Sequence, residues 1–221
     1  MRGIFAACLL AIGAASGSAL LGSFAERSPQ ELLSSDDPDD RLDGAARLAR
    51  SGRDGWPDDH RRAFLGAIAP LAVSSSADHC LPPSVTIAQA VLESGWGTSR
   101  RARDENNLFG MKARAMQGGA QVRTWEVVNG ERVQVVASFR TYGSWAESLA
   151  DHDERLATDA LYAKARAVRH DREAYVDALA SVYATDPAYA ARLATLIEEY
   201  DLDAFDRAAL EAARRRGRCA G

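Results

Sequence analysis

Glu93 is the first candidate for acid–base chemistry, because it ends a helix that is otherwise almost entirely apolar. An apolar run between Pro83 and two glycines predicts a helix that is buried on most sides. Thr86, Gln89 and Glu93 form its narrow polar stripe, at i, i+3 and i+7. Partial burial and the negative end of the helix dipole both raise a carboxyl pKa, and a glutamic acid that keeps its proton near neutral pH can act as a general acid. A glutamate at a helix end is more often simply solvated, so this assignment needs support from its surroundings.

A β-hairpin is predicted on the C-terminal side of this helix. Gln121 to Val128 and Glu131 to Ser138 alternate in residues typical of strands, and they flank Asn129-Gly130. Asn-Gly between two such runs favours a type I′ hairpin turn. Glu126 lies on the first strand, where most glutamates only meet solvent.

The other regular elements are predicted to be helices. An apolar stripe predicts a helix that begins at Asp58-Asp59 and breaks at Ser74-Ser75-Ser76. Ser144 followed by Glu147 fits a capping box, which predicts a helix from there to about residue 156. Asp186-Pro187 fits the start of another helix, with Asp186 as the N-cap. Further helices are expected over residues 98–103, 161–168, 171–183 and 203–215, and a loop over 106–112.

The composition excludes several classes of function. The formal net charge of −4 argues against a nucleic-acid partner, which would favour a basic face. The four histidines are not paired at the spacing of a helical metal site, and no Cys-x-x-Cys occurs, so we expect no metal and no other cofactor and read the histidines as ordinary residues.

The first residues predict export. One positive charge, a small apolar run from Ile4 to Leu21 and a Ser23-Phe24-Ala25 site indicate a signal peptide over 1–25 and a periplasmic protein. The alternative is an uncleaved anchor in the inner membrane, because the apolar run is almost long enough to span a bilayer. We expect a flexible linker over 26–57, the folded domain over 58–202, and a C-terminal helix and tail over 203–221.

Cysteine usage leaves one question open. Once the signal peptide is removed, Cys80 and Cys219 are an even pair in an oxidising compartment. Either they form a disulfide that holds the last helix beside the central one, or both remain free thiols.

Several motifs together resemble glycoside hydrolase family 73. They are Ala88-Gln89-Ala90-Val91-Leu92-Glu93-Ser94-Gly95-Trp96-Gly97, Asn107-Leu108-Phe109-Gly110-Met111-Lys112, Thr124-Trp125-Glu126, Phe139-Arg140-Thr141-Tyr142 and the segment from Tyr183 to Tyr189. The resemblance covers roughly His60 to Leu202. Members of this family are peptidoglycan hydrolases, mostly endo-β-N-acetylglucosaminidases, with a lysozyme-like fold.

The resemblance implies an α+β, mostly helical protein with a helical lobe and a small β-hairpin lobe. Glu93 would be the general acid, Glu126 the base or electrostatic stabiliser, and Tyr183 a third catalytic residue that orients substrate or water. The partner would be the glycan strand of peptidoglycan. The substrate-binding residues that it implies are Gln89, Trp96, Asn107, Phe109, Trp125 and Tyr189, of which Phe109 is equally suited to anchor the core.

Three alternatives remain at this point. The enzyme could be a muramidase or a lytic transglycosylase of the same fold, and a transglycosylase needs only one acidic residue, so Glu126 discriminates between them. The third alternative is a peptidoglycan-binding module without turnover, against which the paired carboxylates argue. The sequence assigns no place in a flagellum or in another envelope-spanning assembly.

Overall fold

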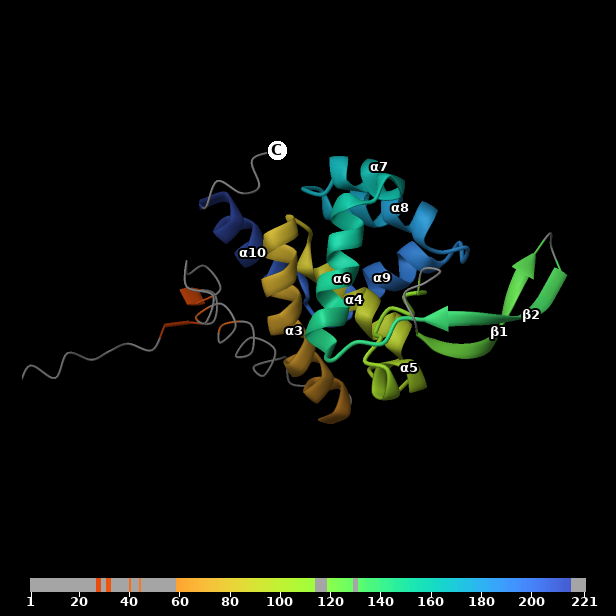
Figure 1. The fold of residues 1–221 in the computed structure, drawn as a ribbon. Helices are drawn as coiled ribbons and strands as arrows, with labels where there is room; N and C mark the ends of the chain where they lie inside the picture. The colour runs from red at the N-terminus through yellow and green to blue at the C-terminus, as the bar shows by residue number, and fades with distance from the viewer. Residues whose placement is uncertain are drawn as a thin grey trace, which may run out of the picture.

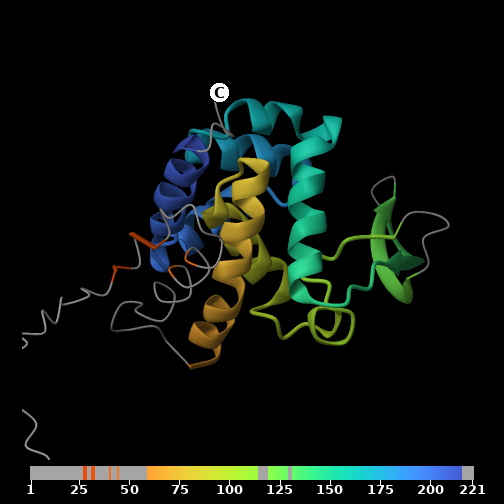
Figure 2. The ribbon, with the colours of Figure 1, turned by 60° about the vertical axis from the view of Figure 1, so that its left-hand side comes forward.

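The computed structural model describes residues 59–113, 119–128 and 131–215, together with residues 27, 28, 31, 32, 40 and 44. Figure 1 shows a body of packed helices from which a two-stranded hairpin extends to one side. The hairpin still stands away from the body when the molecule is turned by 60° (Figure 2). The predicted α+β, mostly helical fold with a helical lobe and a small hairpin lobe is confirmed.

The order of the elements along the described chain follows the prediction closely. They are α3 (Asp59–His79), α4 (Pro83–Ser94), α5 (Arg100–Asp104), β1 (Ala120–Val128), β2 (Glu131–Phe139), α6 (Trp145–Thr158), η1 (Ala160–Tyr162), α7 (Ala163–Ala167), α8 (Arg172–Tyr183), α9 (Tyr189–Glu199) and α10 (Asp203–Arg215). At the start of α6 the hydroxyl of Ser144 accepts the backbone N–H of Glu147, as the capping box predicts.

Helix α4 lies at the centre of the body and is buried along most of its length, as its apolar pattern predicts. It packs against α3, α9 and α10. Each fully buried Val or Ile of such a helix contributes roughly 1.5–3 kcal/mol. The helix ends at Gly95, which adopts a left-handed conformation with φ of 57°. Gly97 follows with φ of 74°. A Cβ at this position would lie 2.9 Å from the ring of Phe64, so only glycine fits there.

The prediction that Ser74-Ser75-Ser76 breaks the first helix is wrong, because α3 continues to His79. The hydroxyl of Ser76 is fully buried and donates a hydrogen bond to Asp153 in α6 (3.1 Å). A serine whose hydroxyl has a buried partner need not compete for the helix backbone, so the polar run stays helical.

The predicted start of the helix after Asp186-Pro187 is two residues too early. The carboxylate of Asp186 accepts the N–H of Ala188 (2.9 Å), and its carbonyl accepts the N–H of Tyr189 (3.0 Å). These bonds form a turn, and α9 begins at Tyr189.

The hairpin has a regular antiparallel register from Ala120 opposite Phe139 to Val128 opposite Glu131. An isolated bridge between Lys112 and Phe139 joins the preceding loop to β2. Both predicted strands are confirmed, and the predicted turn at Asn129-Gly130 lies outside the described residues.

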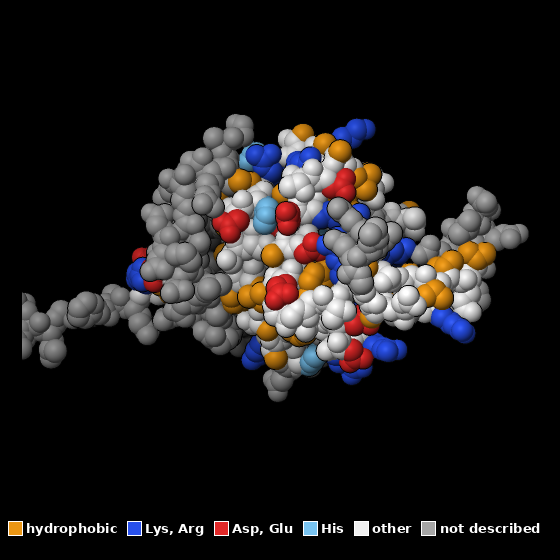
Figure 3. Space-filling model, viewed as in Figure 1, with side chains coloured by type: hydrophobic (Ala, Val, Ile, Leu, Met, Phe, Trp, Pro, Cys, Tyr) orange, Lys and Arg blue, Asp and Glu red, His pale blue; other side chains and the backbone are white. Residues whose placement is uncertain are grey.

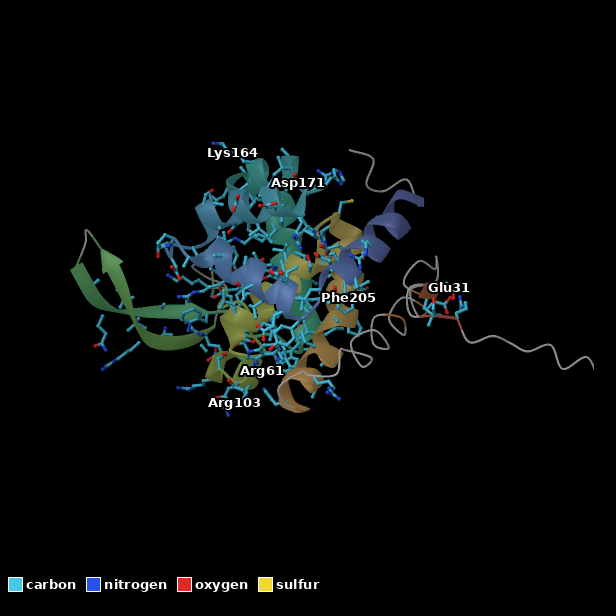
Figure 4. All side chains as sticks on the ribbon, turned by 180° about the vertical axis from the view of Figure 1, so that it is seen from behind. Glu31, Arg61, Arg103, Lys164, Asp171 and Phe205 are labelled. Carbon is cyan, nitrogen blue, oxygen red and sulfur yellow. The ribbon has the colours of Figure 1, made fainter. Side chains whose placement is uncertain are left out.

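Helix α10 packs on α3 and α4 and buries Phe205 against them. Figure 4 shows Phe205 beside α3, with Arg61 and Arg103 at one end of the body and Lys164 and Asp171 at the other.

The predicted signal peptide lies outside the described residues. Of the predicted linker only a few residues are described, and among them Leu32 is buried and Arg27 pairs with Asp40 (2.6 Å). None of the helices that the structure describes is both long and apolar enough to cross a membrane.

Candidate active site

A cleft of about 730 Å³ lies at the C-terminal end of α4. Segments far apart in the sequence form its walls: the end of α4, the loop after Asn107, α6, η1, and the connection between α8 and α9. The lining residues that carry polar or aromatic side chains relevant to chemistry are Glu93, Phe109, His152, Tyr162, Tyr183 and Tyr189. The helical packing therefore brings the candidate acid together with a group of aromatic side chains.

Glu93 reaches solvent through the cleft, while protein atoms displace much of its hydration. This burial raises the pKa of its carboxyl group. A hydrogen bond from the Tyr189 hydroxyl to Oε1 (2.9 Å) and the nearby His152 and Arg101 lower the pKa in part, and the balance remains a raised pKa. Glu93 thus holds its proton at higher pH than an ordinary glutamic acid, as a general acid requires.

Tyr189 is held in place by Gln89, which is fully buried on α4. The Gln89 Nε2 donates a hydrogen bond to the Tyr189 hydroxyl oxygen (3.1 Å), so the hydroxyl hydrogen of Tyr189 is directed to Glu93. Burial also raises the pKa of Tyr189, which keeps the hydroxyl protonated. The two hydrogen bonds, from Gln89 to Tyr189 and from Tyr189 to Glu93, therefore form a chain with one direction that ends in the cleft.

Tyr183 lies against Tyr189 in the wall of the cleft. The two rings are stacked, with centroids 5.6 Å apart and planes 19° apart. Burial raises the pKa of Tyr183 well above that of a free tyrosine, so its hydroxyl is neutral. The structure thus places the predicted third residue next to the partner of Glu93.

His152 is a site residue that the sequence analysis missed. Its side chain is 1% exposed, and its ring stacks on Phe109 with centroids 3.8 Å apart. Asp153 accepts hydrogen bonds from His152 Nδ1 (3.1 Å) and from the hydroxyl of Thr86 (3.0 Å). Phe109 was predicted as a substrate contact or a core anchor. It is 5% exposed and lines the cleft, so it packs in the core and also forms part of the cleft surface.

Three of the predicted substrate-binding residues are not among those that line the cleft. Gln89 is fully buried as described above, and Trp96 packs edge-on against Tyr200 (centroids 5.0 Å apart). Asn107 is 1% exposed; its amide donates to the carbonyls of Met111 and Arg140 (2.9 Å each). None of these three side chains lines the cleft.

The hairpin residues can be placed only by their backbone. Trp125 and Glu126 lie on β1, opposite Gln134 and Val133 of β2. Their side chains lie outside the described residues. The roles expected for Trp125 and Glu126 therefore stay predictions.

Cys80 is disulfide-bonded, just before α4. The predicted partner, Cys219, lies outside the described residues, so the Cys80–Cys219 pairing stays a prediction. In the part of the chain that the structure describes, no group of three or more His, Cys, Asp or Glu is placed to hold a metal ion.

Residues 69–202 match the glucosaminidase family, which is described as mannosyl-glycoprotein endo-beta-N-acetylglucosaminidase. The exo-glucosaminidase LytG of Bacillus subtilis is 35% identical over 153 residues, 67% of this chain and 54% of LytG. The peptidoglycan hydrolase FlgJ of Escherichia coli K12 is 38% identical over 162 residues, 69% of this chain and 50% of FlgJ.

Among solved structures, the catalytic domain of the autolysin Auto from Listeria monocytogenes is similar with a TM-score of 0.61 and 30% identity. The match covers 75% of this chain and 97% of that domain. The chain spans about half the length of the two curated relatives that it matches.

Proposed function

Because this chain belongs to the glucosaminidase family of glycoside hydrolases, family 73, we propose that it hydrolyses the β-1,4 glycosidic bonds of peptidoglycan as an endo-β-N-acetylglucosaminidase. The family and the lysozyme-like fold predicted from the sequence are confirmed by the family match and by the structural likeness to the Auto catalytic domain. The observation that carries the proposal is the carboxyl group of Glu93, with its raised pKa, at the wall of an open cleft.

The proposed reaction begins with proton transfer from Glu93 to the glycosidic oxygen of the leaving sugar. Positive charge then develops on the sugar that is being cleaved, and a second carboxylate stabilises that charge or activates water. We assign this second role to Glu126 on β1, from its place in the family pattern. Tyr189 keeps Glu93 oriented through its hydrogen bond, and Tyr183 supports Tyr189 by stacking.

The products of digestion identify which glycosidic bond is cleaved and by which reaction. Purified peptidoglycan would be digested, and the soluble fragments would be identified by mass spectrometry. The proposal predicts N-acetylglucosamine at the new reducing ends. N-acetylmuramic acid at these ends would indicate a muramidase, and 1,6-anhydro ends a lytic transglycosylase. Binding to the wall without release of fragments would indicate a non-catalytic module.

The assignment of Glu126 has its own test. Glu126→Gln should strongly lower turnover while binding of the wall changes little, because the substitution removes a charge and keeps the shape of the side chain. A Glu126→Gln protein with most of the wild-type activity would favour the mechanism with one acid, and its products should then carry anhydro ends.

We also propose that the protein is exported to the periplasm, where peptidoglycan lies, and that residues 1–25 are the signal. The proposal rests on the apolar N-terminal sequence. The N-terminus of the periplasmic protein, determined by mass spectrometry, should follow Ala25. Full-length chain recovered from washed membranes would instead support an N-terminal anchor.

A further inference from the structure

Leu161 and Val182 are two large apolar side chains that the fold leaves exposed in the cleft. Leu161 is 51% exposed on η1, and Val182 is 39% exposed on the last turn of α8. Both line the cleft that contains Glu93, and η1 packs on α8. Figure 3 shows hydrophobic side chains at the surface in the region of α7 and α8. Exposed aliphatic surface within a cleft offers burial to an apolar group of a ligand.

Tyr162, the neighbour of Leu161 on η1, adds a polar group to the same wall. It is only 5% exposed, yet it lines the cleft. Its hydroxyl makes no hydrogen bond with any residue that the structure describes, and its oxygen is not enclosed by protein atoms. Burial raises the pKa of Tyr162, so the hydroxyl keeps its proton at neutral pH. A firmly packed ring thus presents a neutral hydrogen-bond donor to the cleft.

A series of tyrosine rings connects this wall with the acid. The rings of Tyr162 and Tyr183 have their centroids 6.4 Å apart. Tyr183 in turn stacks on Tyr189, which donates its hydrogen bond to Glu93. Tyr162 is therefore two rings away from the acid, where a neighbouring sugar of the same strand would bind.

A hydrogen-bond donor beside two aliphatic side chains fits the chemistry of an acetamido group. The carbonyl oxygen of this group accepts a hydrogen bond, and its methyl group gains free energy from burial. A sugar hydroxyl has no apolar part, and a carboxylate is bound better by a cation than by a neutral phenol. Every amino sugar of an N-acetylated peptidoglycan strand carries an acetamido group.

We propose that Tyr162, Leu161 and Val182 form a subsite for the acetamido group of a sugar next to the one that is cleaved. The Tyr162 hydroxyl donates a hydrogen bond to the acetamido carbonyl, and the two aliphatic side chains cover the methyl group. This inference rests on the proposed function. The subsite makes the enzyme select N-acetylated strands over strands with free amines or smaller acyl groups.

Binding without turnover provides the test, with three soluble strands that differ only at nitrogen. De-N-acetylated peptidoglycan strands would be used as the free amine, after N-formylation and after N-acetylation. Calorimetry would measure their affinity for a Glu93→Gln protein, and we expect the N-acetyl strand to bind more tightly than the N-formyl strand. Adding Leu161→Ala together with Val182→Ala should reduce this ratio by about fourfold, the effect of burying one methyl group.

Tyr162→Phe tests the hydrogen bond separately from the apolar contact. In the Glu93→Gln background it should weaken both acylated strands by about fivefold and leave their ratio unchanged, because both keep the carbonyl group. Binding of the free-amine strand should change little, since that strand has no carbonyl. Equal weakening of all three strands by Tyr162→Phe would overturn the contact with the acetamido group.

The control is Val168→Ala in the same background, because Val168 is another exposed aliphatic side chain (37%) and does not line the cleft. This variant should keep the ratio of N-acetyl to N-formyl binding. An unchanged ratio in the protein with Leu161→Ala and Val182→Ala would overturn the subsite, as would equal weakening of all three strands by this pair. Loss of the proposed hydrolase function is read separately, as the absence of fragments from wall treated with the wild-type protein.

Discussion

The hydroxyl of Tyr189 on α9 donates a hydrogen bond of 2.9 Å to the carboxyl group of Glu93 on α4, across 96 residues of sequence. This bond acts against the burial that raises the Glu93 pKa, because it stabilises the charged form. The two effects are set by different elements of the fold, since α4 carries the carboxyl group and α9 supplies the donor. A substitution of Tyr189 can therefore change the pKa of Glu93 while Glu93 itself stays in place.

Tyr189→Phe should move the alkaline limb of the kcat/KM profile to higher pH. The substitution removes a contact that favours the ionised carboxylate, so Glu93 should keep its proton further into the alkaline range. The measurement is kcat/KM on soluble glycan strands over a range of pH. Tyr200→Phe is the matched control, because Tyr200 lies outside the cleft and bonds Arg61 (2.8 Å). An alkaline limb that stays in place or moves to lower pH would contradict the role of the bond.

Asp206 on α10 places a buried carboxyl group at the start of α4. It accepts hydrogen bonds from the backbone N–H of Ser84 (2.7 Å) and from its hydroxyl. Burial raises the pKa of Asp206 to about 7, although the bonds from Ser84 lower it. The folded protein therefore binds this proton more tightly than the unfolded chain does.

Linkage gives the sign of the effect on stability. The contribution of Asp206 is fully present below about pH 4, where the unfolded chain is also protonated, and it is lost as the pH rises towards about 7. The free energy of unfolding should fall over this window by at most a few kcal/mol from this group. Asp206→Asn should flatten the decline, as measured by urea unfolding at several pH values. The exposed Asp177→Asn is the control, and an equal slope in wild type and Asp206→Asn would rule out the linkage.

Cys80 is disulfide-bonded, and we predict Cys219 as its partner. Such a bridge closes a loop of about 140 residues, which entropy arguments value at roughly 4–5 kcal/mol. Alkylation of the exported protein should label no thiol before reduction and two thiols after it. Cys219→Ser should leave Cys80 open to alkylation and lower the Tm. Two labelled thiols in the unreduced wild-type protein would show that this pairing does not form.

Local patterns predicted most of the fold and singled out Glu93 as the candidate acid. The apolar run of α4 and its glycine stop place Glu93 at a helix end, and Asn129-Gly130 marks the hairpin, because both signals act over only a few residues. The serines of α3 were misread because their helical conformation depends on a contact far away in the sequence. The partner that satisfies Ser76 is Asp153, 77 residues away, and no local rule reveals it.

The other residues of the cleft were less predictable than the position of Glu93 at a helix end. His152 was read as an ordinary histidine. Its ring stacks on Phe109, which comes from another segment, and no local pattern predicts such a contact. The motif around Asn107 indicated a place near the site, but a motif does not tell a substrate contact from a support. The Asn107 amide makes hydrogen bonds with the backbone of its own loop and of Arg140, and its contact with substrate stays a prediction.

The most direct test of Glu93 as the general acid is the rate at which Glu93→Gln releases soluble fragments from purified peptidoglycan. The amide keeps the size of the side chain and cannot donate the acidic proton, so the rate should fall by roughly 10²–10⁴-fold. Circular dichroism and the Tm should match those of the wild-type protein, because Glu93 faces the cleft and not the core. A folded Glu93→Gln protein that releases fragments at close to the wild-type rate would contradict the account.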